Sequence, residues 1–470
     1  MLDVWGARRK LTAVTDHRAA TAPRHRWILA AVSTALLCVQ LDYFAVNLAL
    51  PKMAEDLGTT ATDLQWVISI YMLALGACMV PAGRIGDIFG RRRILLIGIA
   101  VFGASSAVCA VAPSAAWVIG SRAAQGVGAA LIFPVSVSVL TNAFPVGRAA
   151  RAIGLAYGIG GLGNAAGPLV GGLLTQTVGW RAIFWLLVPL ALVSAVIGGI
   201  TMPESSDHTV PRRVDLSGLA LITIGIGLFT LTFDRGPSWG WLSLPTVAAF
   251  VISMIAMAAF VVTERRVKWP LVDLSLLRDQ RFTMLIVTGT VANIAYVVAI
   301  YLSTLNLQEV RGLDPLTAGL AFLGPSAGAA AGGVFSGRLA TKYPPMVVMG
   351  TTGAAAAISL AVLALSHSWP LYLIALTACG FTMGLVYAFT TVATQAVVPP
   401  EQAGAAAGVA LTSMVTLGGV GIAVTGTVLE MLEHAGSPAS SGTSAILLTI
   451  AILLLPSSLL VLGRAKRTNR

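Results

Sequence analysis

The sequence predicts an all-α polytopic membrane protein with fourteen transmembrane helices arranged 6+2+6. The first observation is composition: of 470 residues, 56% are apolar and only 10% are charged. Soluble domains carry roughly 25% charged residues, so this chain lacks the polar surface that a soluble fold of its size needs. High hydrophobicity also excludes intrinsic disorder. The second and third observations are a series of long apolar stretches and an internal repeat.

The apolar stretches are long enough to be membrane spans. A hydrocarbon core of ~30 Å requires ~20 apolar residues in a helix, and the connections between the stretches are short. The fourteen expected spans are 27–50, 64–83, 93–112, 115–140, 151–174, 181–202, 216–233, 241–263, 282–306, 315–337, 345–366, 370–397, 403–428 and 442–463.

The polar stretches divide these spans into two larger units. The expected organisation is a cytoplasmic tail over 1–26, a six-helix half over 27–202, a linker over 203–281 that holds the two inserted spans, a second six-helix half over 282–463 and a cytoplasmic tail over 464–470.

The net charge of +11 is explained by topology. With the N-terminus inside, 25 of the 30 Lys and Arg residues fall on the cytoplasmic side. Cytoplasmic loops of membrane proteins carry such an excess of cations. Both termini are therefore predicted to be cytoplasmic.

Landmarks recur at an offset of 254 residues, which indicates an internal repeat. Gly58 matches Gly312, and Gly83-Arg84-Ile85 matches Gly337-Arg338-Leu339. Further pairs lie in spans 4 and 5 and in the loop between them: Gly126 and Gly380, Pro145 and Pro399, Gly154 and Gly408, Gly167 and Gly421, Gly172 and Gly426. Spans 1–6 thus correspond to spans 9–14 in the same orientation. Parallel repeats around a midplane cavity are a transporter architecture.

Asp42 and Arg122 are the acid and the base that lie well within predicted spans. At 1.5 Å per residue, both lie roughly 10–12 Å below the outer surface, so they can pair if their helices are neighbours. Positions 35, 38, 42, 45 and 49 place Asp42 on a stripe of small residues. A stripe of this kind faces other helices or a cavity rather than lipid.

Buried ionisable residues of the membrane usually serve a function. Burial favours the neutral form of a carboxyl group and a nearby arginine favours the charged form, so surroundings that change can load and release a proton. We expect Asp42 and Arg122 to provide proton coupling; a fixed ion pair that only specifies packing is the alternative. The matching positions of the second half hold Tyr296 and Leu376.

Two further segments have distinctive patterns. The loop after span 2 contains Gly83, Asp87, Gly90, Arg91 and Arg92, where Asp87 can cap a helix or pair with a cation; a plain topology signal would need only the arginines. Span 5 is rich in glycine, and we expect a deformable helix at the interface of the halves, with ordinary close packing as the alternative. Its key residues are Gly163, Gly167, Pro168, Gly171 and Gly172.

These residues resemble motifs of the major facilitator superfamily, and more narrowly of its fourteen-span drug:proton antiporters. The segment 83–93 is similar to the signature between spans 2 and 3, which forms a cytoplasmic gate. The segment 122–130 resembles the span 4 motif implicated in proton transfer, 163–172 the antiporter motif, and 41–51 the span 1 motif. Three departures are Phe44 in place of a small hydroxyl residue, Ala182 in place of an aromatic residue, and the lack of an acid in the loop 337–343.

The resemblance implies the major facilitator fold and a proton-driven antiporter that exports hydrophobic or amphipathic drugs or antibiotics, cations among them. An exporter of an endogenous lipid or secondary metabolite is the first alternative, and a non-transporting receptor is the second. We expect no enzymatic activity, no cofactor or metal apart from the coupling protons, no nucleic-acid partner, a monomer, and location in a bacterial cytoplasmic membrane. The polar residues expected in an otherwise apolar substrate cavity are Gln40, Tyr43, Asn47, Gln125, Tyr157, Tyr296 and Tyr301.

Overall fold

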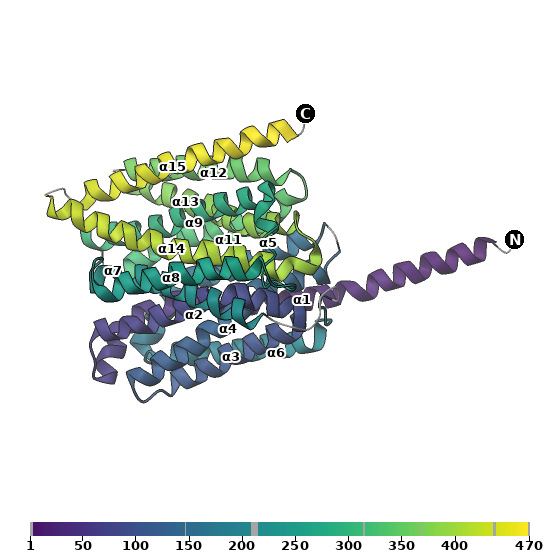
Figure 1. Cartoon of the computed structure of the whole chain (residues 1–470), viewed down its shortest axis with the longest axis horizontal. Helices are drawn as coiled ribbons and strands as arrows, with labels where there is room; N and C mark the ends of the chain where they lie inside the picture. The colour runs from purple at the N-terminus through teal and green to yellow at the C-terminus, as the bar shows by residue number, and fades with distance from the viewer. Residues whose placement is uncertain are drawn as a thin grey trace.

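The computed structural model describes residues 3–145, 147–207, 215–313, 315–366, 368–435 and 439–468. Parts of the predicted tails and of the predicted linker, at 1–2, 208–214 and 469–470, lie outside this range. The described chain is all-helical, and its long helices run side by side in one bundle (Figure 1).

The first half contains six long helices, and two more follow in the predicted linker. Their bounds are α1 (Asp3–Leu57), α2 (Ala61–Phe89), α3 (Arg91–Ala110), α4 (Ala115–Ala143), α5 (Ala149–Thr177), α6 (Arg181–Thr201), α7 (Leu216–Trp239) and α8 (Leu244–Glu264). The start of α7 is capped by Asp215, whose carboxylate accepts a hydrogen bond from the Ser217 backbone N–H. The first helix begins inside the predicted tail, and its N-terminal part extends beyond the bundle (Figure 1).

The second half repeats this series. Its helices are α9 (Gln280–Leu305), α10 (Pro315–Ala321), α11 (Leu323–Ala340), α12 (Pro345–Leu365), α13 (Trp369–Gln395), α14 (Ala403–His434) and α15 (Ala439–Thr468). Three short segments accompany them: η1 (Leu276–Arg278), η2 (Asn306–Val310) and η3 (Pro400–Gln402). The single span expected over 315–337 is thus divided into α10 and α11. Pro325 lies in the first turn of α11 and has no N–H to bond the Ala321 carbonyl at the end of α10, which accounts for the division.

The two halves pack their helices in the same way. In the first half α2 contacts α4, α3 contacts α6 and α1 contacts α5; in the second, α11 contacts α13, α12 contacts α15 and α9 contacts α14. Gly58 and Gly312, matched by the repeat, have positive φ angles of 63° and 65°, a conformation that glycine adopts without steric cost. Across the interface, α5 packs on α11 and α2 on α14, which are equivalent pairs under the repeat.

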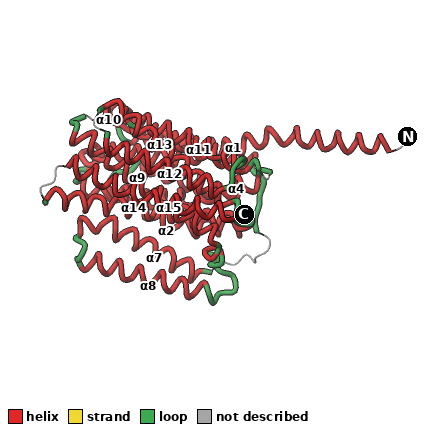
Figure 2. The backbone as a smooth tube through the Cα atoms, turned by 90° about the horizontal axis from the view of Figure 1, so that it is seen from above, coloured by secondary structure: helices red, strands yellow, loops and turns green. Residues whose placement is uncertain are grey.

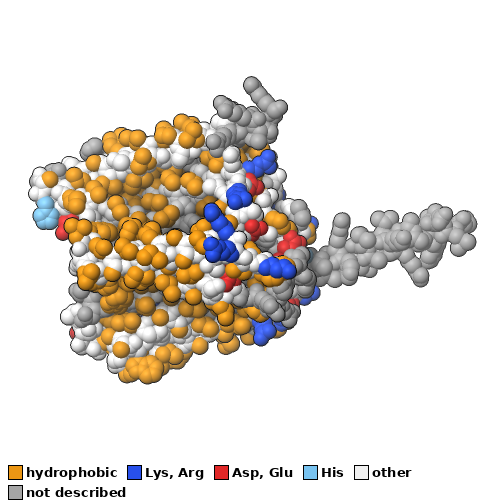
Figure 3. Space-filling view, in the orientation of Figure 1, with side chains coloured by type: hydrophobic (Ala, Val, Ile, Leu, Met, Phe, Trp, Pro, Cys, Tyr) orange, Lys and Arg blue, Asp and Glu red, His pale blue; other side chains and the backbone are white. Residues whose placement is uncertain are grey.

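Thirteen helical segments of the described chain are long and apolar enough to cross a membrane. They do not include α5, so the predicted count of fourteen is not confirmed. The chain is a multi-pass membrane protein. On the face seen in Figure 3, Lys and Arg side chains gather at the end from which the N-terminal part of α1 emerges, and apolar side chains cover much of the rest.

The inserted helices α7 and α8 form a pair beside the bundle (Figure 2). Of the two, α7 contacts both α2 and α14, which belong to different halves. At one end Arg235 donates to Ser69 Oγ (3.1 Å) and stacks on Trp66 of α2, with its Cζ 3.8 Å from the ring centroid. Trp241, in the turn after α7, donates to Thr427 Oγ1 of α14 (3.2 Å). The insert therefore bridges the two halves along one seam.

Candidate functional site

Asp42 and Arg122 form a buried ion pair within the first half. Arg122 Nη1 lies 2.5 Å from Asp42 Oδ2, and the two side chains are 1% and 0% exposed. The same nitrogen donates to Gln125 Oε1 (2.8 Å), and Gln125 Nε2 donates to Ser106 Oγ (2.8 Å) and to Asp42 Oδ1 (3.3 Å). We call Asp42, Arg122 and Gln125 the charge cluster. Asp42 comes from α1, and Arg122 and Gln125 come from α4. The sequence predicts similar depths for Asp42 and Arg122.

The sequence of α1 accounts for the position of Asp42. The small residues predicted to share its stripe, Ala35, Cys38, Ala45 and Ala49, are all buried. Small side chains allow the neighbouring helices to approach closely, and α5 is the helix that packs most extensively on α1. The carboxylate is thus held inside the half rather than facing lipid.

The glycines of the span 5 motif form this contact with α1. A Cβ placed on Gly163 would lie 2.7 Å from the Leu37 carbonyl oxygen, and one on Gly167 would lie 2.6 Å from Phe44 Cβ. Gly171 is pressed against Ala45 in the same way. These three glycines therefore pack closely against α1 of their own half.

Other glycines of α5 make the contact between the halves. Gly158 lies against the Ala330 carbonyl of α11, at 2.9 Å from an added Cβ, and Gly154 lies against Gly333 at 2.8 Å. The helix α5 thus does lie at the interface, with its two glycine faces directed to different partners. Pro168 and Gly172, the other residues of the motif, are partly exposed.

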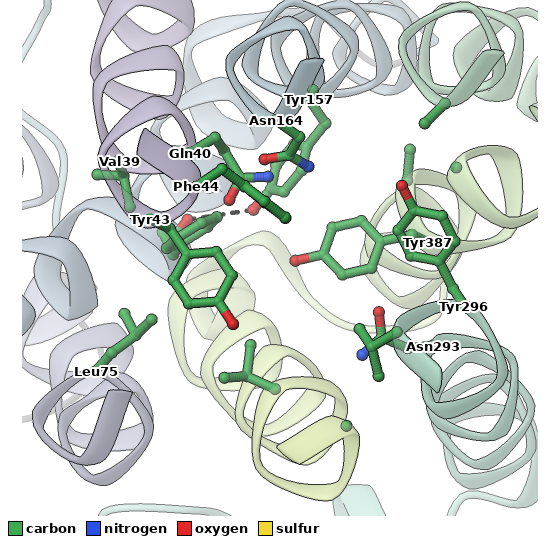
Figure 4. Close-up of a pocket in the computed structure, with 18 of the residues that line it drawn as sticks. Val39, Gln40, Tyr43, Phe44, Leu75, Tyr157, Asn164, Asn293, Tyr296 and Tyr387 are labelled. Atoms are coloured by element: carbon green, nitrogen blue, oxygen red, sulfur yellow. Dashed lines mark hydrogen bonds between the residues drawn. The ribbon is translucent and has the colours of Figure 1, made fainter. Parts of the chain in front are cut away.

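A cavity of about 170 Å³ lies between the halves. Figure 4 shows Gln40 and Tyr43 of α1 on one side and Tyr296 and Tyr387 of the second half across from them. The lining consists of apolar, tyrosine, amide and glycine residues from eight helices, and none of the described lining residues is charged. Pockets for drug-sized ligands have ~300–1,000 Å³, so this cavity must widen to hold such a compound.

Four of the seven predicted cavity residues line this space: Gln40, Tyr43, Tyr157 and Tyr296. Gln125 instead lies in the charge cluster. Asn47 is exposed, and its Nδ2 donates to the Tyr43 carbonyl (2.8 Å). Tyr301 lies near Gly426, where its Oη is 3.5 Å from an added Cβ. The roles given to all seven stay predictions.

Four polar lining residues were missed by the sequence reasoning: Tyr71, Asn164, Asn293 and Tyr387. Two had a usable signal. Asn293 lies one turn before Tyr296, on the same helix face, and Asn164 interrupts the glycine-rich run of span 5. Tyr71 and Tyr387 lie in largely apolar spans, where a tyrosine equally fits plain packing.

Asp87 joins one end of the first half to α14. Its Oδ1 accepts from Arg91 Nε (2.8 Å) and Ser138 Oγ (2.9 Å), and its carboxylate also accepts from the backbone N–H groups of Gly404 (3.3 Å) and Ala405 (3.0 Å). A helix N-terminus carries partial positive charge and unpaired N–H donors. The carboxylate therefore caps a helix of the opposite half.

The other residues of the loop motif reinforce this contact. Arg91 Nη2 donates to the carbonyls of Pro400 (3.2 Å) and Glu401 (2.8 Å), just before α14. Gly83 and Gly404 contact each other through their backbones, with no room for a side chain on either. Gly90 has a φ of 113° at the turn between α2 and α3, and Arg92 donates to the Gly199 carbonyl. In this conformation the two halves are joined at this end of the bundle.

Within the described ranges no three His, Cys, Asp or Glu side chains are grouped so as to hold a metal ion. The four cysteines, Cys38, Cys78, Cys109 and Cys379, are free thiols. The site thus consists of a buried charge cluster, an uncharged central cavity and the end of the bundle at which Asp87 joins the halves.

Parallel repeats of membrane helices around a central cavity define the protein as a membrane transporter. The sequence profile of the Major Facilitator Superfamily matches residues 32–424, and the chain belongs to this family. It is therefore a transporter and not an enzyme.

Relatives of this family support a narrower class. The chain is 33% identical over 406 residues to the multidrug resistance protein Stp of Mycobacterium tuberculosis, covering 85% of this chain and 75% of that protein. It is 30% identical over 404 residues to the tetracenomycin C resistance and export protein of Streptomyces glaucescens, with the same coverage. It is 32% identical over 430 residues to the multidrug efflux pump LfrA of Mycolicibacterium smegmatis, covering 89% and 84%. The expected resemblance to drug antiporters of the superfamily is thus confirmed.

A solved structure with the same fold is that of the human organic anion transporter MFSD10 (TETRAN). Its TM-score is 0.66 at 15% sequence identity, over 93% of this chain and 99% of that chain. At this identity the likeness concerns the fold alone.

Proposed function

We propose that the chain is a proton-coupled exporter of hydrophobic or amphipathic compounds, cations among them, that works by alternating access. The observation that carries this proposal is the buried charge cluster beside an uncharged cavity. A proton-driven exporter needs a carboxyl group that can be neutralised without leaving the membrane. Asp42, fully buried and paired with Arg122, fits this requirement.

The proposed cycle uses the cluster as a switch. A proton taken up from outside neutralises Asp42 and weakens its attraction to Arg122. The relative stability of the two conformations then changes, which is all that a bound ligand can do. Asp87 and Arg91, with their contacts to α14, act as the cytoplasmic gate that holds the inner side closed. Release of the proton inside resets the cycle.

The same proposal covers topology and location. We take α5 as the fourteenth span, which gives six helices, two inserted helices and six helices, with the halves at 27–202 and 282–463. The gathering of cations at one end (Figure 3) supports cytoplasmic termini in a bacterial cytoplasmic membrane. The transporter works as a monomer, with protons as its coupling ions and no other cofactor.

Two classes of substrate are to be distinguished by experiment. Names of relatives supply two test compounds, since one exports tetracenomycin C and another is the puromycin resistance protein of Streptomyces alboniger. An endogenous lipid or secondary metabolite is the alternative substrate. Resistance of an efflux-deficient host to a drug panel, set beside lipid profiling of a deletion strain, separates the two.

The test of proton coupling uses Asp42→Asn. We expect this variant to reach the membrane at wild-type abundance and to lose pH-gradient-driven efflux of puromycin in proteoliposomes. Glu55→Gln is the matched control, because Glu55 is an exposed acid of the same helix, paired only with Lys52 at the surface; it should pump normally. Normal pumping by Asp42→Asn would contradict the mechanism, and a wild type that moves puromycin without moving protons would contradict proton coupling itself.

A further inference from the structure

Tyr71 of α2 lies between the cavity and the charge cluster. It lines the cavity, and Arg122 stacks on its ring with Cζ 4.1 Å from the centroid. A guanidinium at this distance from an aromatic face is attracted by the ring quadrupole. Asp42, Arg122 and Gln125 do not line the cavity themselves. Tyr71 is thus a cavity residue in direct contact with the arginine of the cluster.

The surrounding backbone fixes this arrangement. Arg122 Nε donates to the carbonyl of Val67 (3.0 Å), one turn before Tyr71 in α2. One turn after Arg122 in α4, Gly126 lies directly against the Tyr71 carbonyl, with no room for a Cβ. The guanidinium is therefore tied to the same stretch of α2 that carries the ring. A displacement of that stretch must alter the contact between ring and guanidinium.

The hydroxyl of Tyr71 is the second observation. The side chain is 0% exposed, and its Oη has no hydrogen-bond partner among the described residues. An unpaired buried polar group is rare in native structures. Other tyrosines of the cavity differ: Tyr157 Oη donates to the Phe133 carbonyl (3.4 Å), and among the described arginines none stacks on Tyr43, Tyr157, Tyr296 or Tyr387.

We propose that Tyr71 is the positioning residue that couples substrate occupancy of the cavity to the charge state of Asp42. This inference rests on the proposed function. The hydroxyl is the group that a substrate engages, which selects compounds with a hydrogen-bonding oxygen or nitrogen on an apolar frame. The ring is the group that transmits this engagement to Arg122.

The coupling follows from the partners of Arg122. While Asp42 is charged, the guanidinium is balanced by the carboxylate. When Asp42 takes up a proton, the guanidinium loses its counter-charge. Its attraction to the ring face of Tyr71 then makes up a larger share of the interactions that stabilise the cation. A substrate that forms a hydrogen bond with the Tyr71 hydroxyl draws the ring away from the guanidinium and so opposes proton uptake by Asp42. Proton and substrate therefore bind antagonistically, and the effect is reciprocal.

The experiment measures the affinity of purified protein for radiolabelled puromycin at one acidic and one alkaline pH. We expect wild-type affinity to be higher at alkaline pH by at least about fivefold, the lower range of typical coupling. Tyr71→Leu removes the ring, and the ratio should fall to about one. Tyr71→Phe keeps the ring but lacks the hydroxyl through which a substrate pulls on it, so its ratio should also fall to about one, with puromycin bound about tenfold more weakly at alkaline pH.

Tyr387→Leu and Tyr387→Phe are the matched controls, since Tyr387 lines the cavity from the second half. They should weaken binding but keep the wild-type pH ratio. A wild-type pH ratio in Tyr71→Leu would overturn the proposal. An unchanged puromycin affinity in Tyr71→Phe would also overturn it, and this second variant remains usable if Tyr71→Leu fails to fold. A wild type whose affinity is independent of pH would overturn the proposed function, and this inference with it.

Discussion

The two halves share their helix packing but differ in where they bury charge. Of the described side chains, every buried Asp, Glu, Lys and Arg precedes α9. Positions that hold Asp42 and Arg122 in the first half hold Tyr296 and Leu376 in the second. Duplication has therefore kept the scaffold, while the ionisable chemistry is confined to one copy.

The difference extends to the end of the bundle at which Asp87 joins the halves. Asp87 corresponds to Thr341, whose hydroxyl is satisfied within its own helix end by the Arg338 carbonyl (2.8 Å). Asp87 of the first half thus caps α14 of the second half. The matching position of the second half holds no acid that could cap a helix of the first half. Glycine contacts, in contrast, are symmetrical across the interface. This asymmetry suggests experiments that make one half like the other.

The largest effect is expected from Arg122→Leu, which gives the first half the residue of the second. It leaves Asp42 buried without a cation, and breaking a buried pair in this way costs ~3–5 kcal/mol. We expect a large fall in the thermal unfolding midpoint of the detergent-purified protein and loss of efflux. The double variant Asp42→Asn with Arg122→Leu should regain much of the stability, but not the efflux.

Leu376→Met is the control for this substitution. It changes shape at the matching buried position with little change in volume, and such swaps usually cost less than ~1.5 kcal/mol. If the double variant unfolded as readily as Arg122→Leu alone, the pair would not be the source of the asymmetry.

The next effect is expected from Asp87→Asn. The amide keeps the shape but loses the charge that receives Arg91 and two N–H groups of α14, and hydrogen bonds to charged groups contribute ~1.5–3 kcal/mol each. The cytoplasmic side should open more often. Alkylation of Ala407→Cys, a position 0% exposed on α14, by an impermeant maleimide in inside-out vesicles should rise at least about tenfold, which corresponds to 1.4 kcal/mol.

Thr341→Ala tests the same position of the repeat in the second half. Because Thr341 is exposed and bonded only locally, we expect alkylation at Ala407→Cys to remain at the wild-type rate. An equal rise in both variants would show that the cytoplasmic closure depends on both halves alike.

The sequence predicted the long apolar helices well, because hydropathy is read along one segment, and it placed Asp42 and Arg122 where they could pair. It did not predict partners far away in the chain. Asp87 meets Gly404 and Ala405, more than 300 positions later, and no local pattern specifies that contact. A glycine-rich helix such as α5 has no single face marked by periodicity, so the sequence did not show that Gly163 and Gly167 contact α1. The cavity residue Tyr387 was missed because no local pattern shows which elements its helix face meets.

A smaller effect, and an equal one in both halves, is expected from the interface glycines Gly83→Ala and Gly337→Ala. A Cβ on Gly83 would run into the Gly404 carbonyl, and one on Gly337 would lie 2.7 Å from Arg151 Cα of α5. Backbone contacts cannot yield as a flexible side chain does, so closure of the cytoplasmic end should be impaired. We expect the maximal efflux rate to fall about tenfold in each, equivalent to ~1.4 kcal/mol. Gly120→Ala, with nothing within 4 Å of its added Cβ, should pump at the wild-type rate; a defect in one interface variant alone would break the symmetry argued for the scaffold.

The smallest effect is expected from Asn293→Leu in the second half. Its Nδ2 donates to the Met414 carbonyl (2.8 Å), and hydrogen bonds between membrane helices average only ~0.6 kcal/mol, so the unfolding midpoint should fall slightly. Because Asn293 lines the cavity and is remote in sequence and contact from the charge cluster, puromycin affinity should change while the stimulation of efflux by a pH gradient persists. The matched comparison is Gln125→Leu, because Gln125 is an amide residue of the first half that donates a hydrogen bond to Asp42. Loss of pH stimulation in Gln125→Leu but not in Asn293→Leu is the expected result, and loss in both would mean that coupling is not confined to the first half.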